Sequence, residues 1–282
     1  MSRFAPLPYF LTGLLPFGLG TLISGASGFP MRPAVWGIGL AGVAALLLAA
    51  FASRQAFAPE GRCPTLPGLS PTGARRLAYG ALGLAGFLGL FCQFRLHTGD
   101  LTLPLGGLGL LFGYFYFAPP LQWHRRGLGE VAGGLSFGLL PVAAAFYLQG
   151  GRAITEILLF GLPLSLAGFN LFLVHGFPRA GEEPPARHSL AARLGPVAGA
   201  LIYTLMNILT IAGLVFCLMF PANPLPLREG LLLPLLLAVV NQELIKRKAY
   251  RDEARLKLLC RLTLALHLSM GLAFSLSLWP RL

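Results

Sequence analysis

Long apolar runs alternate with short polar connections along the whole chain. A helix needs about 20 apolar residues to cross the hydrocarbon core of a bilayer. Nine ranges meet or approach that length, namely 8–28, 33–53, 76–97, 101–118, 131–149, 154–175, 196–220, 229–246 and 257–279. The fourth and fifth ranges are short and rich in glycine, so counts of eight or ten stay open. The pattern predicts an all-α, polytopic membrane helical bundle of about nine transmembrane helices, forming a single domain over residues 1–282.

The composition agrees with a chain that lies mostly in lipid. Of its 282 residues, 55% are hydrophobic and only 11% are charged, and the mean hydropathy is +0.71. A typical soluble domain carries about 25% charged residues. The chain therefore has too few charges to cover a water-facing surface. Range 8–28 lacks a clear small-residue cleavage site and is followed at once by further spans, which favours a membrane helix over a signal peptide.

Lysines and arginines are concentrated in alternate connections. One side of the predicted bundle carries Arg3, Arg54, Arg62, Arg75, Arg76, Arg125, Arg126, Arg179, Arg187, Arg193, Lys246, Arg247, Lys248, Arg251, Arg255 and Lys257. The other side carries Arg32, Arg95, Arg152, Arg228 and Arg281. Cytoplasmic loops of membrane proteins carry an excess of these residues. The distribution predicts an inner (cytoplasmic) membrane protein whose N-terminus and basic loops are cytoplasmic.

The net charge of +12 does not indicate a nucleic-acid partner. The basic residues lie at the ends of apolar runs rather than in one stripe. The four cysteines, Cys63, Cys92, Cys217 and Cys260, are far apart and form no CxxC pair, so neither a zinc site nor a disulfide framework is supported. The predicted partner is the bilayer itself, and additional subunits remain open.

The densest polar stretch follows the sixth predicted helix. The sequence NLFLVHGFPRAGEEPPARHSLAARLG covers residues 170–195. Ionisable groups at membrane depth are expensive to place and mark functional sites by default. Asn170 lies within the apolar part of this stretch, where it can either line a cavity or form a hydrogen bond to a neighbouring helix.

Three segments resemble the UbiA superfamily of intramembrane prenyltransferases, especially its menaquinone-type branch. The opening PYFLTGLLPFGLGTLISG is similar to the first helix of that family. The segment YFYFAPPLQWHRRGLGEVAGGLSFGLLPVAAAFYLQGG has its Tyr-rich helix end, proline turn, basic residues, Gly-Leu-Gly-acid and Gly-rich helix. The pair HGFPRAGEE and HSLAARLG is similar to its second acidic motif and the Arg-Leu-Gly ending that follows.

This resemblance implies a bundle around a central cavity that a polyisoprenyl diphosphate enters from the lipid. In the family the headgroup lies under a cytoplasmic cap and is held by Mg²⁺ bridged to two acidic motifs. Ionisation leaves an allylic cation, which a small aromatic or quinone-precursor acceptor captures. A metal or a cationic clamp helps the diphosphate to leave because it stabilises the charge that develops.

The sequence departs from the family at the first acidic motif. Its only aspartates are Asp100 and Asp252. The motif Asn-Asp-x-x-x-Asp belongs at the end of the second predicted helix, where this chain reads FASRQAFAPEGR. Ser53 and Arg54 occupy the leading positions, and no acid precedes Glu60.

The second acidic motif is also altered. Arg179 stands at the place of the leading aspartate and His175 at that of an asparagine, whereas Glu183 matches the trailing acid and Glu182 adjoins it. Arginine in place of an acid repels Mg²⁺ but binds phosphate bidentately. Glu183 with Glu182 or Glu60 is the remaining candidate for a single Mg²⁺.

The predicted substrate-binding residues combine these motif positions with the central loop. They are Arg54, Arg125, Arg126, Glu130, Asn170, His175, Arg179 and Arg187. Glu130 has an alternative role, because a negative charge at the start of a helix is favoured by the helix dipole.

Three functions stay open on the sequence alone. The first is an active prenyltransferase whose arginines clamp the diphosphate. The second is a catalytically degenerate relative that binds an isoprenoid, a quinone or another anionic lipid, or that serves as a membrane subunit of a larger complex. The third is a structural bundle whose basic loops only set its topology.

Overall fold

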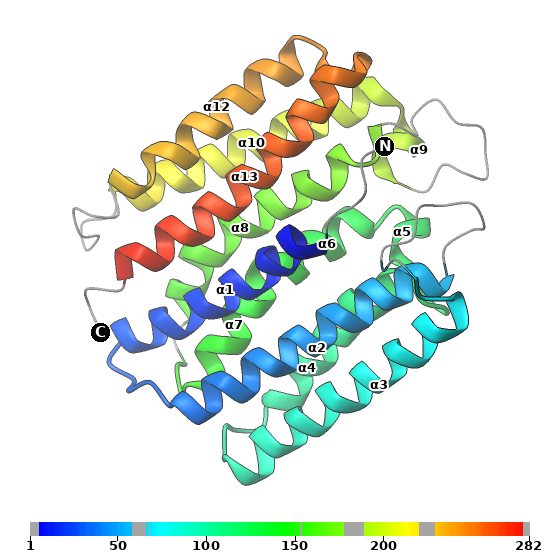
Figure 1. Cartoon of the computed structure of the whole chain (residues 1–282). Helices are drawn as coiled ribbons and strands as arrows, with labels where there is room; N and C mark the ends of the chain where they lie inside the picture. Colours follow the sequence, from blue (N-terminus) through cyan, green and yellow to red (C-terminus); the bar gives the residue numbers. More distant parts are fainter. Residues whose placement is uncertain are drawn as a thin grey trace. The chain divides into compact units, whose positions relative to one another are not determined.

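Helices dominate a computed structural model of the protein (Figure 1). The structure describes residues 6–57, 66, 68–152, 154–177, 189–219 and 229–278, and these contain no strand. The helices are α1 (Pro6–Ala26), α2 (Pro33–Phe57), α3 (Pro71–Leu90), η1 (Phe91–Arg95), α4 (Thr102–Gly113), η2 (Tyr114–Tyr116), α5 (Trp123–Arg126), α6 (Gly129–Phe137), α7 (Leu139–Leu148), α8 (Ile154–Val174), α9 (Leu190–Leu194), α10 (Pro196–Met219), α12 (Leu232–Lys246), η4 (Ala249–Arg251) and α13 (Glu253–Leu278).

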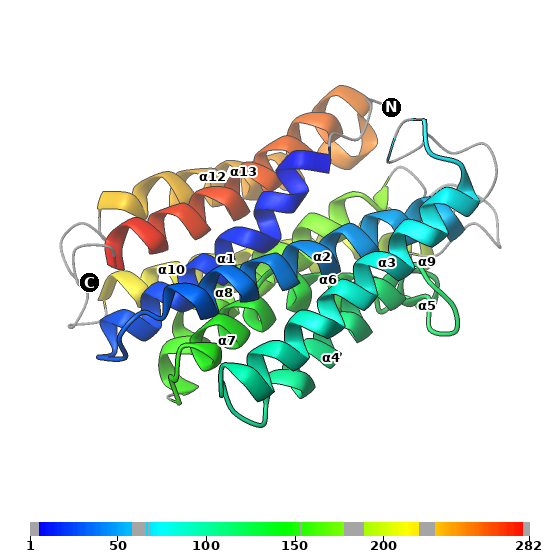
Figure 2. The same cartoon turned by 60° about the horizontal axis from the view of Figure 1, so that its bottom comes forward.

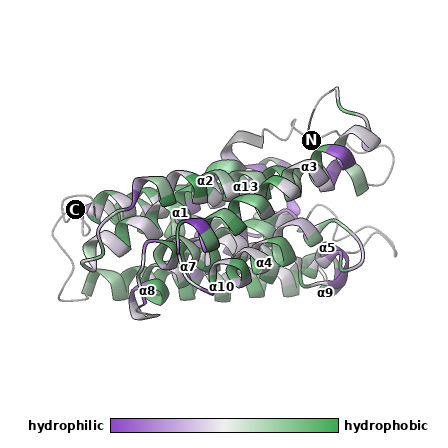
Figure 3. Ribbon diagram, turned by 90° about the horizontal axis from the view of Figure 1, so that it is seen from below, coloured by the Kyte–Doolittle hydropathy of each residue, from purple (hydrophilic) through white to green (hydrophobic). Residues whose placement is uncertain are grey.

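The all-α membrane bundle expected from the sequence is confirmed. Each of the nine predicted ranges overlaps one helix or two consecutive helices. Seven described segments are long and apolar enough to cross a membrane, and the fourth range contains a shorter apolar helix, Thr102–Tyr116. Hydrophobic residues dominate these helices in Figure 3. The chain is therefore an integral membrane protein.

The chain forms two compact units, which are described separately. Unit 1 comprises residues 1–123 and 140–152, and unit 2 comprises residues 124–139 and 153–282. The single domain expected over residues 1–282 stays a prediction.

Unit 1 is built on the pairing of α2 with α3, which lie side by side in Figures 1 and 2. Small residues allow the close approach, because Ala49 and Ala52 of α2 belong to one buried cluster with Ala78 and Ala81 of α3. Small residues are typical of interfaces between membrane helices, where backbones must come close to gain packing energy. A second cluster, which includes Phe17 of α1, joins this helix to the beginning of α2 and the end of α7.

Unit 2 contains α6, α8, α9, α10, α12 and α13, and polar side chains join its helices. Asn170 Nδ2 of α8 donates to the Tyr203 carbonyl of α10 at 3.1 Å, and the Tyr203 hydroxyl contacts Thr263 Oγ1 of α13 at 2.7 Å. Asn207 Nδ2 donates to Gln242 Oε1 of α12 at 3.0 Å. Hydrogen bonds of this kind stabilise helix pairs in lipid, where an unpaired polar group has no water to bind.

The fifth predicted helix, range 131–149, is interrupted in the structure and forms two helices. Gly138 separates α6 from α7, and the Leu139 amide donates to Ser165 Oγ of α8 at 2.7 Å. A Cβ at position 138 would collide with the Ser165 backbone. The break therefore depends on a glycine that permits close approach and on a serine from another helix that accepts the Leu139 N–H.

The Ser165→Ala substitution tests this account of the break. Removing the hydroxyl leaves the Leu139 N–H without its acceptor, which we expect to cost about 1 kcal/mol. The purified protein in detergent should melt at a lower temperature by scanning fluorimetry. Ser136→Ala is the matched control, because Ser136 Oγ is buried without a hydrogen-bond partner among the described residues. Equal melting temperatures for the two variants would contradict the assignment.

Candidate functional site

The polar residues of unit 2 that the sequence singled out gather at one end of its helices. We define the cap as residues 124–130, 175–177 and 189–194. It contains the basic part of α5, the beginning of α6, the segment that follows α8, and α9. A buried apolar cluster that includes Leu173, Phe177 and Ala191 joins the end of α8 and the segment that follows it to α9. The Phe177 ring also stacks on Tyr250 at a centroid distance of 5.5 Å.

Glu130 connects two parts of the cap. It lies in the first turn of α6 and is only 3% exposed. Its Oε1 accepts a hydrogen bond from the Leu190 amide at 2.8 Å, and Leu190 is the first residue of α9. A carboxylate at a helix N-terminus satisfies an amide that the helix itself leaves unpaired. Glu130 is thus next to two helix N-termini, its own and that of α9, which extends the helix-start role considered from the sequence.

One carboxylate oxygen of Glu130 is available to bind a ligand. Its Oε2 is buried and has no hydrogen-bond partner within the described ranges. Burying a carboxylate oxygen without a hydrogen-bond partner costs free energy. A water molecule, an ion or a ligand group would supply the missing partner.

A second bond joins the same two segments. Arg193 Nη1 of α9 donates to the Arg126 carbonyl at 2.6 Å. Gly127 follows with φ +74°, and a Cβ there would lie 2.6 Å from Arg193 Nη1. Gly127, the first glycine of the Gly-Leu-Gly-Glu sequence, is therefore favoured by its left-handed backbone, and it leaves room for this guanidinium.

The described part of the cap exposes more positive than negative charge. Arg125, Arg126 and Arg193 are exposed, whereas Glu130 is buried. Figure 3 shows hydrophilic residues on α5 and α9. Arginine presents several N–H donors in a planar fork that matches phosphate oxygens. This arrangement is suited to an anion with several oxygen atoms.

Two other predicted residues are His175, within the cap, and Asn170, below it. His175 follows α8 and is exposed, and its Nδ1 lies 2.6 Å from the Leu171 carbonyl. Asn170 lies one turn further into α8 and is 1% exposed, with its Nδ2 bound to Tyr203 O. The interhelical hydrogen bond, one of the two roles expected for Asn170, is thus present. Its Oδ1 is buried and has no partner in the described part of the chain.

The position of the first acidic motif lies in unit 1. Arg54 is half-buried in the last turn of α2. The Ser53 hydroxyl is buried and donates to the Ala50 carbonyl at 2.8 Å. Gln55 binds the segment before α3, because its Oε1 accepts from the Leu66 amide at 2.6 Å.

The described residues do not fit a Mg²⁺ site. They contain no group of three His, Cys, Asp or Glu side chains that could hold a metal ion. The metal candidates Glu182 and Glu183, the alternative Glu60, and the substrate candidates Arg179 and Arg187 lie outside the described residues. Their roles stay predictions.

Arg193 belongs to the cap but was not among the predicted site residues. The signal was present in the sequence, since Arg193 is part of the Arg-Leu-Gly ending that resembles the family. Its contact with Arg126 joins positions 67 residues apart. Outside the cap, Glu243 Oε1 pairs with Arg247 Nε at 2.6 Å, and His267 is buried with its Nε2 2.9 Å from the Phe137 carbonyl.

Known proteins agree with this architecture. Residues 62–269 match the UbiA prenyltransferase family. Over 126 residues the chain is 30% identical to the 2-carboxy-1,4-naphthoquinone phytyltransferase of Synechocystis sp., and this match covers 43% of the chain but only 40% of that relative. The resemblance to a single quinone-pathway relative is thus partial.

Solved structures of similar fold cover nearly the whole chain. The apo structure of a UbiA homologue from Aeropyrum pernix K1 has a TM-score of 0.70 at 16% identity, covering 94% of this chain and 96% of its own. A UbiA homologue from Archaeoglobus fulgidus bound to GPP and Mg²⁺ has a TM-score of 0.58 at 13% identity, covering 96% and 98%. At these identities the structures support the fold. The match over residues 62–269, which is more than half of the chain, shows that the chain belongs to the UbiA prenyltransferase family.

Proposed function

We propose that this UbiA-family protein binds a polyisoprenyl diphosphate at the cap of unit 2 and transfers the prenyl group to a small aromatic quinone precursor. The observation that carries the proposal is the pair of bonds from Glu130 to Leu190 and from Arg193 to Arg126. Because these bonds fix α9 against the beginning of α6, they hold exposed arginines on one part of the unit. Preorganised cations stabilise a phosphate leaving group without reorganisation during the reaction.

The proposed ligand class is supported by two relatives. A solved UbiA homologue is bound to GPP and Mg²⁺, and the Synechocystis relative is a phytyltransferase acting on 2-carboxy-1,4-naphthoquinone. We propose a ligand of the same class for this chain, with the acceptor drawn from aromatic or quinone-type compounds. The positive-inside distribution of lysine and arginine supports a cytoplasmic cap.

The proposed reaction breaks the bond between the allylic carbon and the diphosphate oxygen. Both electrons of the bond leave with the diphosphate, whose charge Arg125, Arg126 and Arg193 neutralise. The allylic cation forms a bond to a nucleophilic carbon of the acceptor, and that carbon then loses its proton to water. Glu130 acts as a positioning residue, because it fixes α9 and, through it, Arg193. The described residues contain no group of three metal-ligating side chains, so in this proposal the arginines neutralise the diphosphate.

The alternative is a relative that binds the isoprenoid, a quinone or another anionic lipid without turnover, alone or within a larger complex. It is favoured by Arg179, which stands at the place of the leading aspartate in the second motif and would repel Mg²⁺. Binding and turnover must therefore be measured separately.

Binding is tested with Arg125→Gln and Arg126→Gln. Each substitution removes a charged donor to the diphosphate, which we expect to weaken the binding of geranylgeranyl diphosphate about tenfold. Isothermal titration of the detergent-purified protein measures the change in Kd. Arg255→Gln is the control, because Arg255 is an exposed arginine of unit 2 outside the cap. If Arg255→Gln weakens binding as much, general electrostatic attraction explains the affinity and the cap assignment is wrong.

Turnover is tested by diphosphate release from a polyisoprenyl diphosphate in the presence of a naphthoquinone-type acceptor and Mg²⁺. We expect the wild type to release diphosphate and Glu183→Gln to lose at least tenfold in rate, because Glu183 matches the trailing acid of the second motif. A wild type that binds the substrate but releases no diphosphate would instead support the binding role without chemistry.

The positioning role of Glu130 is tested by hydrogen exchange. Glu130→Ala removes the acceptor of the Leu190 amide, so we expect exchange in residues 190–194 to become about tenfold faster. Glu130→Gln keeps a carbonyl oxygen for this bond and should retain most of the protection. Substrate affinity should fall with Glu130→Ala and recover with Glu130→Gln. Loss of affinity in both variants with unchanged exchange would show that the carboxylate itself contacts the ligand.

A further inference from the structure

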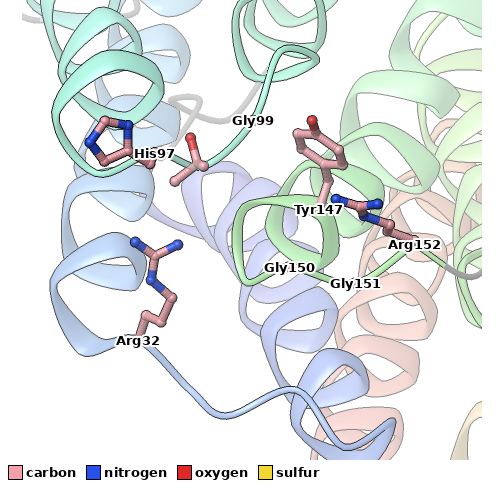
Figure 4. Close-up of a pocket in the computed structure, with 8 residues that line it drawn as sticks. Arg32, His97, Gly99, Tyr147, Gly150, Gly151 and Arg152 are labelled. Carbon is pink, nitrogen blue, oxygen red and sulfur yellow. The ribbon is translucent and has the colours of Figure 1, made fainter.

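A second basic site lies in unit 1, at the opposite end of α2 from Arg54. Three turns meet there: the segment before α2, the turn from η1 to α4, and the turn after α7. They enclose a cavity of about 150 Å³, lined by side chains that include Arg32, His97, Thr98, Tyr147 and Arg152 (Figure 4). We call it the Arg32 cavity. Nothing in the proposed prenyl chemistry uses it.

The cavity is built by specific bonds between these turns. The Arg32 amide donates to Gln149 Oε1 at 2.7 Å, and Gln149 is 3% exposed. Arg32 Nη2 also donates to the Leu96 carbonyl. The Leu101 amide donates to the Tyr147 hydroxyl at 3.1 Å. Polar atoms thus hold together turns that are more than 40 residues apart in sequence.

The backbone at the rim is constrained as well. His97 has φ +51°, a left-handed conformation that is uncommon outside glycine. Such residues concentrate at ligand sites, where the surrounding structure maintains the strain. His97 is exposed and lines the cavity together with the buried Thr98.

The charge of the cavity indicates an anionic ligand. In Figure 4 the Arg32 guanidinium points toward the turn that carries His97, while Tyr147 and Arg152 approach from the other side. No ion pair joins Arg32 or Arg152 to an acidic residue in the described part of the chain. Asp100 lies in the same turn as His97 and follows the lining residue Gly99, but it is exposed and does not itself line the cavity. The Tyr147 oxygen accepts a hydrogen bond from Leu101, so its own proton is available for donation.

The volume of the cavity and the apolar residues beside it restrict the class of ligand to a small anionic group next to lipid. Sites for whole organic ligands occupy about 300–1,000 Å³, which is more than this cavity offers. Met31, Phe94 and Leu101 lie close in sequence to the lining residues and are exposed large hydrophobic side chains. Basic pockets between membrane helices on the cytoplasmic side bind lipid head groups. The Arg32 cavity has the same combination of cations and adjoining apolar side chains, on the opposite side of the predicted topology.

We propose that the Arg32 cavity binds the phosphate group of an anionic phospholipid, with Arg32 and Arg152 as its cationic contacts and Tyr147 as a neutral donor. The acyl chains lie along the exposed apolar side chains beside it. This proposal is independent of the prenyl chemistry, because the lining residues belong to unit 1 and none of them belongs to the cap.

The test uses the full-length protein in phosphatidylcholine nanodiscs that contain a phosphatidylglycerol analogue with a diazirine near its head group. After illumination, we expect crosslinks in residues 96–101 and none of comparable yield from the matching phosphatidylcholine analogue. Arg152→Gln should lower the yield about tenfold at subsaturating lipid. The control is Arg95→Gln, an exposed arginine of η1 that does not line the cavity, and it should leave the yield within about twofold.

Two competitors distinguish the sources of the phosphate group. Competition by unlabelled phosphatidylglycerol alone would show that the acyl chains contribute, and competition by inorganic phosphate as well would show that the phosphate group suffices. Both results support the site. Equal crosslinking of the phosphatidylcholine analogue, or an equal loss of yield in Arg95→Gln, would overturn it. Arg32→Gln should act like Arg152→Gln; because Arg32 also binds Leu96, the conclusion rests on Arg152→Gln if the Arg32 variant does not fold.

Discussion

The absence of water from the hydrocarbon core determines where this chain can place its polar groups. A buried polar atom in lipid must be paired within the protein or remain at a cost of several kcal/mol. Unit 2 meets this constraint by bonds between helices, such as those from Asn170 and Asn207 to α10 and α12. At the interruption between α6 and α7, Ser165 Oγ accepts the hydrogen bond of the Leu139 amide. The charged residues gather instead at helix ends, where binding chemistry becomes possible.

The cap shows how one acid can organise several cations. Glu130 is buried and bound to the Leu190 amide, so it acts on the backbone of α9 rather than on solvent. Arg193 lies on the same short helix, and its Nη1 donates a hydrogen bond to the Arg126 carbonyl. Since the acid is buried and the arginines are exposed, the charge presented by this surface is positive. A protein family that uses acidic motifs thus includes a chain whose described cap is suited to direct contact with phosphate.

The two basic regions differ in a way that suggests different ligands. The cap of unit 2 presents exposed arginines, and Glu130 Oε2 and Asn170 Oδ1 are buried polar atoms of the same unit that have no partner among the described residues. The Arg32 cavity of unit 1 is a small hollow between turns, and exposed apolar side chains adjoin it in sequence. The first arrangement suits a ligand with a diphosphate, whereas the second has room for a single head group.

The hydrophobic pattern by itself determined the all-α membrane architecture, because only helices or closed barrels can satisfy the backbone in lipid and runs of about 20 apolar residues select helices. The motif residues indicated the family and placed Arg125, Arg126 and Glu130 in one loop. The break at Gly138, the bond from Glu130 to Leu190 and the convergence of Arg32, His97 and Arg152 were decided only by the tertiary structure. Each depends on contacts between residues far apart in sequence, which local periodicity and spacing do not encode.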